Sequence, residues 1–321
     1  MTLAHLFFSD KPDIRWDLCA QMGVRAAVAK LAPELTGRAP VWDFESLKMA
    51  KGHFEDRGFS LVALEGDQFD MTRIKLGLPG WKDDVRLYCR MLENMGRLGI
   101  RTLCYNFMYT GWTRTRTDIR ARGGALVTGF SRAEAVLLPP SPHAPVDGER
   151  IWKNYERFIA EVIPAAEHAG VRMALHPDDP PVEVLQGIAR TFICPEAIDR
   201  ALSLNSSGCH GLTFCQGTFA TMGANLKECF LRWRGRFPFI HRRDVAGTAE
   251  DFRETFPDEG PTDIPGMLAF YKGCGFDGIV RSDHTPAMAG DCNSTPGYNA
   301  TGAVFGTGYL MGIMDALKTG R

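Results

Sequence analysis

The sequence predicts an α/β protein that folds as a single (β/α)8 barrel, the TIM-barrel architecture. Short apolar or β-branched runs recur eight times, and a longer amphipathic or polar stretch follows most of them. The chain has 321 residues, which is enough for eight βα units of the usual size. A doubly wound open sheet is the structural competitor, but no GxGxxG motif follows the first run. We see no linker, and therefore expect residues 1–321 to form one domain.

Eight candidate strands follow one another along the chain, and the run at residues 3–9 is the least distinct of them. The other seven runs occupy residues 25–30, 60–65, 101–106, 172–177, 212–217, 237–242 and 278–283. Between the runs, amphipathic patterns predict helices at 41–58, 83–100, 151–170 and 264–276. Val85, Tyr88 and Leu92, for example, are spaced by three and four residues. Gly58 and Gly170 stand where glycine commonly ends a helix.

One segment, residues 109–150, does not fit this alternation. It is rich in arginine, glycine and proline, and it is too long for an ordinary connection between a strand and a helix. Long connections of this kind often carry function. We therefore expect 109–150 to be an irregular loop over the active site.

Composition excludes several classes of protein. Hydrophobic residues make up 45% of the chain, which is ample for a folded core. Lys plus Arg number 37 against 38 Asp plus Glu, so no general attraction to nucleic acid or to an anionic membrane is expected. No apolar run is long enough to span a membrane, and the N-terminus lacks the pattern of a secretory signal. The chain has nine cysteines and no CxxC pair, which indicates a protein of the reducing cytoplasm. No sequence pattern distinguishes a monomer from a homo-oligomer.

Four potential metal ligands stand at the ends of successive predicted strands. They are His176, Cys215, His241 and Asp283. In a barrel the carboxyl ends of the strands converge on one mouth, where the active site lies. A single His or Cys at such a place is usually a packed core residue, but four at equivalent places favour a metal site. Two imidazoles, a thiolate and a carboxylate suit Mn²⁺, Fe²⁺, Co²⁺ or Zn²⁺.

Charged residues near two of these motifs are candidates for binding a small anionic substrate. Asp178 and Asp179 lie in the rigid turn HPDDPP, where they can support the histidine ligand, bind a sugar hydroxyl, or simply cap a turn. Arg114 and Arg116 lie in WTRTRTD, within the segment 109–150. A guanidinium matches a carboxylate with two parallel hydrogen bonds, although most surface arginines are only solvated.

Two residues after the last predicted strand are candidate proton carriers. His284 belongs to DHTP and Tyr298 to PGY. Histidine titrates near neutral pH, and a tyrosine beside a cation can serve as a base. A tyrosine that follows Pro-Gly is, however, more often a packing residue.

Together these motifs resemble the mannonate dehydratase family of the xylose-isomerase-like barrels. They occur in one order from about residue 40 almost to the C-terminus: IKLGLPG, CYNFM, WTRTRTD, HPDDPP, GLTFCQG, IHRRDV, RSDH and PGY. The resemblance implies a metal-dependent lyase of hexuronate catabolism, a branch of carbohydrate metabolism, which removes water from D-mannonate to give 2-keto-3-deoxy-D-gluconate. It implies Mn²⁺ or Fe²⁺ on the same four ligands, His284 and Tyr298 as acid and base in either order, and Arg243 as a family arginine near the substrate.

The chain departs from the family pattern at several positions, and we expect a changed substrate to involve three of them. His210 replaces an asparagine, Arg242 is new, and Asp244 replaces an amide. The departures leave open a dehydratase of another aldonate, or an inactive homologue that only binds a sugar acid. A sugar isomerase or epimerase of the same superfamily is a further alternative, which a cysteine ligand disfavours. A zinc hydrolase on the same barrel is the weakest one.

Overall fold

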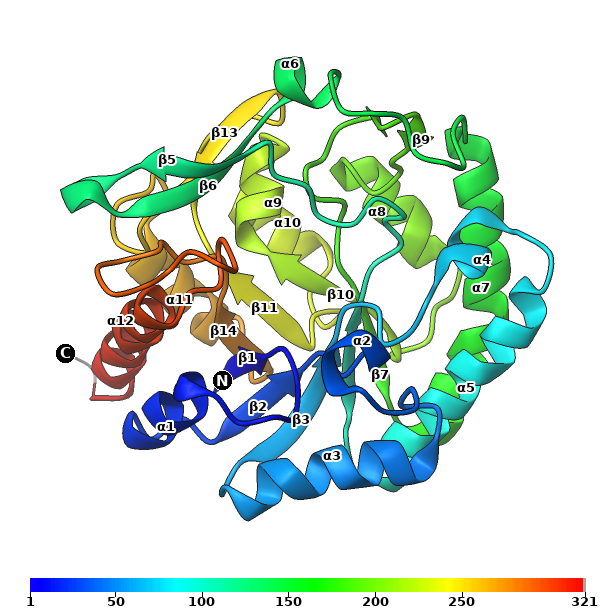
Figure 1. Cartoon of the computed structure of the whole chain (residues 1–321), viewed down its shortest axis with the longest axis horizontal. Helices are drawn as coiled ribbons and strands as arrows, with labels where there is room; N and C mark the ends of the chain where they lie inside the picture. Colours follow the sequence, from blue (N-terminus) through cyan, green and yellow to red (C-terminus); the bar gives the residue numbers. More distant parts are fainter. Residues whose placement is uncertain (320–321) are drawn as a thin grey trace.

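Eight parallel strands close into a barrel at the centre of the structure (Figure 1), and the computed structural model describes residues 1–319. Around the barrel the strands follow the order β1-β14-β11-β10-β7-β4-β3-β2. Their bounds are β1 (Thr2–Phe7), β2 (Ala26–Ala29), β3 (Ser60–Glu65), β4 (Thr102–Tyr105), β7 (Arg172–Leu175), β10 (His210–Cys215), β11 (Phe239–Arg242) and β14 (Ile279–Ser282). The predicted (β/α)8 barrel is confirmed, and each of the eight predicted runs overlaps one of its strands.

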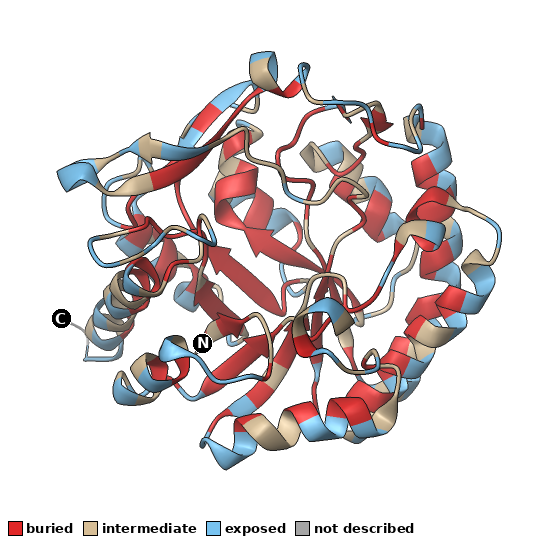
Figure 2. Ribbon diagram, viewed as in Figure 1, coloured by how far each residue is buried: buried red, intermediate tan, exposed pale blue. Residues whose placement is uncertain are grey.

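The barrel strands are buried on both faces (Figure 2). Every residue of β2, β4, β10 and β11 is buried. Small side chains such as Ala4, Ala63 and Ala174 fill the interior of the barrel, while larger ones pack between the strands and the surrounding helices. Strands buried on both faces appear in a sequence as nearly continuous apolar runs, which is why the pattern revealed all eight.

Helices surround the barrel and turn their buried faces toward it (Figure 2), and most of the buried side chains are apolar. Their bounds are α1 (Ile14–Gln21), α2 (Pro33–Thr36), α3 (Phe44–Asp56), α4 (Thr72–Leu76), α5 (Trp81–Arg97), α7 (Gly148–Ala169), α8 (Pro195–Ser203), α9 (Gln216–Thr221), α10 (Leu226–Arg232), α11 (Ile264–Gly273) and α12 (Ala300–Thr319). The four predicted helices correspond to α3, α5, α7 and α11. No helix within residues 1–319 has both the length and the apolar character needed to cross a membrane.

The segment 109–150 is not irregular throughout, so that expectation was wrong for residues 116–135. It contains β5 (Arg116–Arg120), the short helix η1 (Arg122–Gly124), β6 (Leu126–Ser131) and α6 (Arg132–Ala135). The two strands join β12 (Val245–Gly247) and β13 (Asp251–Glu254) in an antiparallel sheet of order β12-β13-β6-β5, which we call the side sheet. It lies beside the barrel (Figure 1). Because β6 pairs with a strand about 120 residues later in the chain, no local sequence pattern predicts the side sheet. A short hairpin of β8 (Val184–Leu185) and β9 (Ile188–Ala189) completes the strands of the described chain.

Candidate active site

A cavity of about 200 Å³ opens at the carboxyl ends of the barrel strands. Its walls come from nearly every strand end, as the positions of Phe8, Lys30, Glu65, Asn106, His176 and Asp283 illustrate. Tyr109, Gly111 and Trp112, from the start of the 109–150 segment, also line it. The mouth of the barrel, where the sequence placed the chemistry, is therefore a real cavity, and part of 109–150 borders it.

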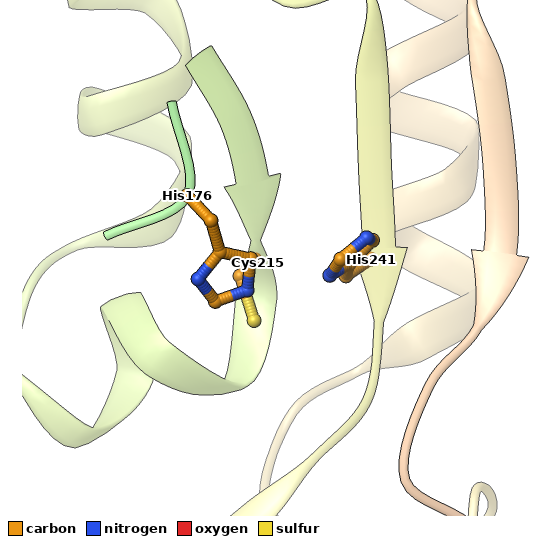
Figure 3. A group of neighbouring side chains, drawn as sticks. All are labelled: His176, Cys215 and His241. Carbon is orange, nitrogen blue, oxygen red and sulfur yellow. The ribbon is translucent and has the colours of Figure 1, made fainter. Parts of the chain in front are cut away.

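Three of the four predicted metal ligands come together (Figure 3), and two of them, His176 and His241, line this cavity, whereas Cys215 is fully buried beside them. His176 follows β7, Cys215 ends β10 and His241 lies on β11, and their ligand atoms all lie within 4.8 Å of one another. The Nδ1–H of His176 donates to the carbonyl oxygen of Pro177 at 2.6 Å, so its Nε2 is free to bind an ion. Burial alone would raise the pKa of the Cys215 thiol, but nearby Arg243 and His176 more than offset it and hold that pKa well below its ordinary value.

The fourth predicted ligand, Asp283, lies at the edge of this group. Its Oδ2 is 3.7 Å from Nδ1 of His241, and its Oδ1 is 2.9 Å from NH1 of Arg281. Nδ1 of His241 is buried and has no hydrogen-bond partner. A buried ring nitrogen of this kind, surrounded by a thiol, an imidazole and a carboxylate, is what a divalent ion needs, so these residues fit the implied metal.

A second group contacts the other side of His241 and was not predicted from the sequence. Glu65, at the end of β3, places Oε2 3.3 Å from Nε2 of His241, and Cys104 Sγ is 3.9 Å from the same nitrogen. Arg281 donates to both oxygens of Glu65. Burial opposes ionisation of Glu65, but Arg281 and His241 lower its pKa to about 2. The ionised Glu65 is thus oriented to accept Nε2–H, which leaves Nδ1 of His241 free for an ion.

The two predicted proton carriers are in direct contact at the cavity wall. Nε2 of His284 lies 2.9 Å from the hydroxyl of Tyr298, and that hydroxyl is 3.4 Å from Oδ1 of Asp283. The ring of Trp112 lies against His284, with centroids 4.5 Å apart. The structure therefore brings the proton carriers beside the candidate metal ligands.

The predicted substrate-binding arginines are not presented to the cavity. Arg114 forms two parallel hydrogen bonds with Asp179, at 3.0 and 2.9 Å, and its side chain is only 2% exposed. Arg243 donates to Asp179 at 2.6 Å and to Glu254 at 2.5 Å and is fully buried. Arg116 lies on the side sheet, where it pairs with Glu134. Of these residues only Asp179 borders the cavity.

Asp178 has a structural environment. It is 2% exposed, and its Oδ2 accepts the backbone N–H groups of Thr191 and Phe192 at 2.8 and 3.2 Å. Those bonds fix the turn after β7, in keeping with the alternative that this residue caps a turn.

The three departures from the family pattern also lie away from the cavity. His210 is at the start of β10, at the opposite end of that strand from Cys215, and Nε2 of its ring is 3.2 Å from the Tyr155 hydroxyl. Arg242 donates to the carbonyl oxygen of Pro257, and Asp244 accepts from Thr262. None of the three borders the cavity, so these departures do not alter the side chains that line it.

Comparison with known proteins places the chain among sugar-acid dehydratases. A family model described as D-mannonate dehydratase (UxuA) matches residues 1–137 and 141–321. A mannonate dehydratase of Streptococcus pneumoniae is 29% identical over 92% of this chain and 87% of its own length. Mannonate dehydratase 1 of Bacillus licheniformis is 30% identical over 86% and 85%.

Solved structures show the same relation. The crystal structure of mannonate dehydratase from Streptococcus suis serotype 2 superposes with a TM-score of 0.90 at 28% identity, and the match covers 100% of this chain and 95% of that one. A 3-keto-D-glucoside 4-epimerase from E. coli matches with a TM-score of 0.62 at 13% identity, over 98% and 99% of the two chains. At that identity the second likeness is one of fold only.

Proposed function

The chain belongs to the D-mannonate dehydratase (UxuA) family, and we propose that it removes water from D-mannonate to give 2-keto-3-deoxy-D-gluconate. The observation that carries the proposal is the pairing, in one cavity, of a set of metal-ligating side chains with two contacting proton carriers. The family match over nearly the whole chain supplies the reaction and the substrate.

We propose that a divalent ion is held by His176, Cys215, His241 and Asp283, and that Mn²⁺ or Fe²⁺ is the native ion, although Co²⁺ and Zn²⁺ suit the same donors. When bound, the ion supplies a Lewis acid that stabilises negative charge on the substrate carboxylate. Pro177 and Glu65 support this assignment because each fixes the ring of one histidine ligand.

The chain's own residues move the protons. The hydrogen on the carbon next to a carboxylate is only weakly acidic, so a base must remove it while an acid assists the departing hydroxyl. His284 and Tyr298 border the same cavity 2.9 Å apart. One of the two takes the C2 proton and the other protonates the C3 hydroxyl, which leaves as water. The enol that remains becomes the 2-keto acid.

A direct assay tests the proposal. The purified, reduced protein is loaded with Mn²⁺ and incubated with D-mannonate and a panel of other aldonates, and 2-keto-3-deoxy acid is measured. We expect product from D-mannonate. Product from another aldonate alone would contradict D-mannonate as the substrate but support the dehydration reaction. If no acid gives product while metal is bound, the proposal is contradicted.

The isomerase alternative is supported by the shared fold alone, because the isomerase-like and epimerase structures that resemble this chain are only 10–15% identical to it. The family match likewise gives no support to the zinc hydrolase. We propose a cytoplasmic location, which fits nine cysteines that form no disulfide within residues 1–319.

A further inference from the structure

A carboxylate from outside the barrel contacts one of the two proton carriers. Glu254 ends β13 of the side sheet, and its Oε1 lies 2.8 Å from Nδ1 of His284. Its side chain is 3% exposed, and it does not border the cavity. Of the side chains that Glu254 contacts directly within residues 1–319, His284 is the one that borders the cavity.

Glu254 is held in place by two buried arginines. Arg114 donates to its Oε1 at 2.7 Å and Arg243 at 2.5 Å. The same arginines bind Asp179, so two positive and two negative groups balance inside the protein. The backbone of Glu254 is paired with Val245 in the side sheet. A carboxylate fixed on both its backbone and its side chain can hold its neighbour in one orientation.

The two arginines also approach Nδ1 of His284, so the direction of the hydrogen bond needs an argument. NH1 of Arg243 is 3.0 Å from Nδ1, and NH2 of Arg114 is 3.3 Å from it. Each of these nitrogens lies closer to Glu254 Oε1, at 2.5 and 2.7 Å. A carboxylate is a stronger acceptor than a ring nitrogen, so the arginines donate to Glu254. Nδ1 of His284 is then left to donate its own proton to the same oxygen.

We propose that Glu254 is the positioning residue for His284. By accepting the Nδ1–H group, Glu254 fixes the ring and keeps the lone pair of Nε2 facing the hydroxyl of Tyr298, 2.9 Å away. The side sheet thus connects an element outside the barrel to a proton carrier inside the cavity. The kinetic consequence rests on the proposed function, whereas the hydrogen bond itself does not.

Kinetics test the catalytic consequence. Glu254→Gln should lower kcat about 100-fold, the scale of a lost acid–base contribution, while KM for D-mannonate stays within about threefold. Glu250→Gln is the matched control, because Glu250 is exposed in the turn between β12 and β13 and, within residues 1–319, pairs only with Arg132. In a His284→Asn background, Glu254→Gln should cost less than about twofold, since its effect acts through the ring. An unchanged kcat in Glu254→Gln, or a full additional loss in the His284→Asn background, would overturn the proposal.

A second measurement needs no substrate. In wild-type protein freed of paramagnetic ions, ¹⁵N NMR of the histidine rings, with His284 assigned from His284→Asn, should place a proton on Nδ1 in a downfield, exchange-protected signal. That signal should shift in Glu254→Gln. A bare Nδ1 in the wild type would overturn the proposal, even where the variant fails to fold. Protein with the protected Nδ1 proton but no turnover of D-mannonate would refute the proposed function and leave the positioning role intact.

Discussion

At the scale of single residues, hydrogen-bond partners orient the two histidine rings of the candidate metal site. His176 gives its Nδ1 proton to a backbone carbonyl, and His241 faces Glu65 through Nε2. The two rings therefore present opposite nitrogens to the same space. The ligands could be predicted from their position at the ends of the predicted strands. The tautomers of the two histidines could not, because they depend on neighbours that only the fold brings together.

Glu65→Gln should weaken metal binding because the amide removes the charge that stabilises His241, and it also removes one of the two carboxylates that pair with Arg281. We expect the Kd for Mn²⁺ to rise by about 10- to 100-fold, the range seen when a residue that orients a ligand is changed. Titration of metal-free protein measures this value. Glu167→Gln, on the exposed side of α7, is the control, and equal affinities in the two variants would refute the role of Glu65.

Lys30 is the basic side chain of the cavity wall that we expect to contact substrate. It follows β2 and forms no ion pair within residues 1–319, whereas Arg281 is paired with Glu65 and Asp283. Lys30→Met should raise KM about 10-fold and leave kcat nearly unchanged, because it removes binding common to substrate and transition state. Steady-state kinetics of Lys30→Met measure this effect, and Lys82→Met, at an exposed position, is the control. A drop in kcat at constant KM would contradict this role.

At the scale of elements, the sequence predicted what local patterns encode. All eight barrel strands could be read because each is a buried apolar run. The side sheet could not, because β6 finds its partner β13 far along the chain. Helix α12 was also missed, since its glycines obscure the amphipathic spacing.

The same limit governs the site. His176, Cys215 and His241 were predicted because each lies near the end of a predicted strand. The same criterion, applied to the run 60–65, would also have selected Glu65. Glu254 gave no such signal, because its place depends on the side sheet. The pairing of Arg114 with Asp179 and Glu254 gave no signal either, because these carboxylates are 65 and 140 residues away in the chain.

The glycines of α12 let this helix lie against the end of β14 and the segment that follows it. A Cβ on Gly302 would lie 1.9 Å from the carbonyl oxygen of Pro286, whereas one on Gly308 would meet nothing within 4 Å. Gly302→Ala should therefore lower the free energy of unfolding by about 1–3 kcal/mol. Gly308→Ala should be neutral or stabilising by up to about 1 kcal/mol. Urea unfolding of both variants checks this prediction, and equal stabilities would contradict the close approach.

At the scale of the whole molecule, buried ionised carboxylates make stability depend on pH. Burial alone would raise the pKa of Asp179 and of Glu254, but Arg114 and Arg243 lower both below their ordinary values. Groups with a depressed folded-state pKa contribute stability above their unfolded pKa, about 4, and lose it as pH falls toward the folded value. The midpoint of urea unfolding should thus hold between pH 7 and pH 5 and fall steeply below pH 4. A flat profile to pH 3 would contradict this.

The central claim is that the family's dehydration takes place in this cavity with a metal ion on the predicted ligands. The most direct measurement follows 2-keto-3-deoxy-D-gluconate formed from D-mannonate by metal-depleted protein before and after Mn²⁺ is added, together with the bound metal. We predict product only after Mn²⁺ is restored, one ion per chain in the wild type, and loss of both in Cys215→Ser but not in Cys274→Ser. Product formation by metal-free wild type, or full activity in Cys215→Ser, would contradict the claim.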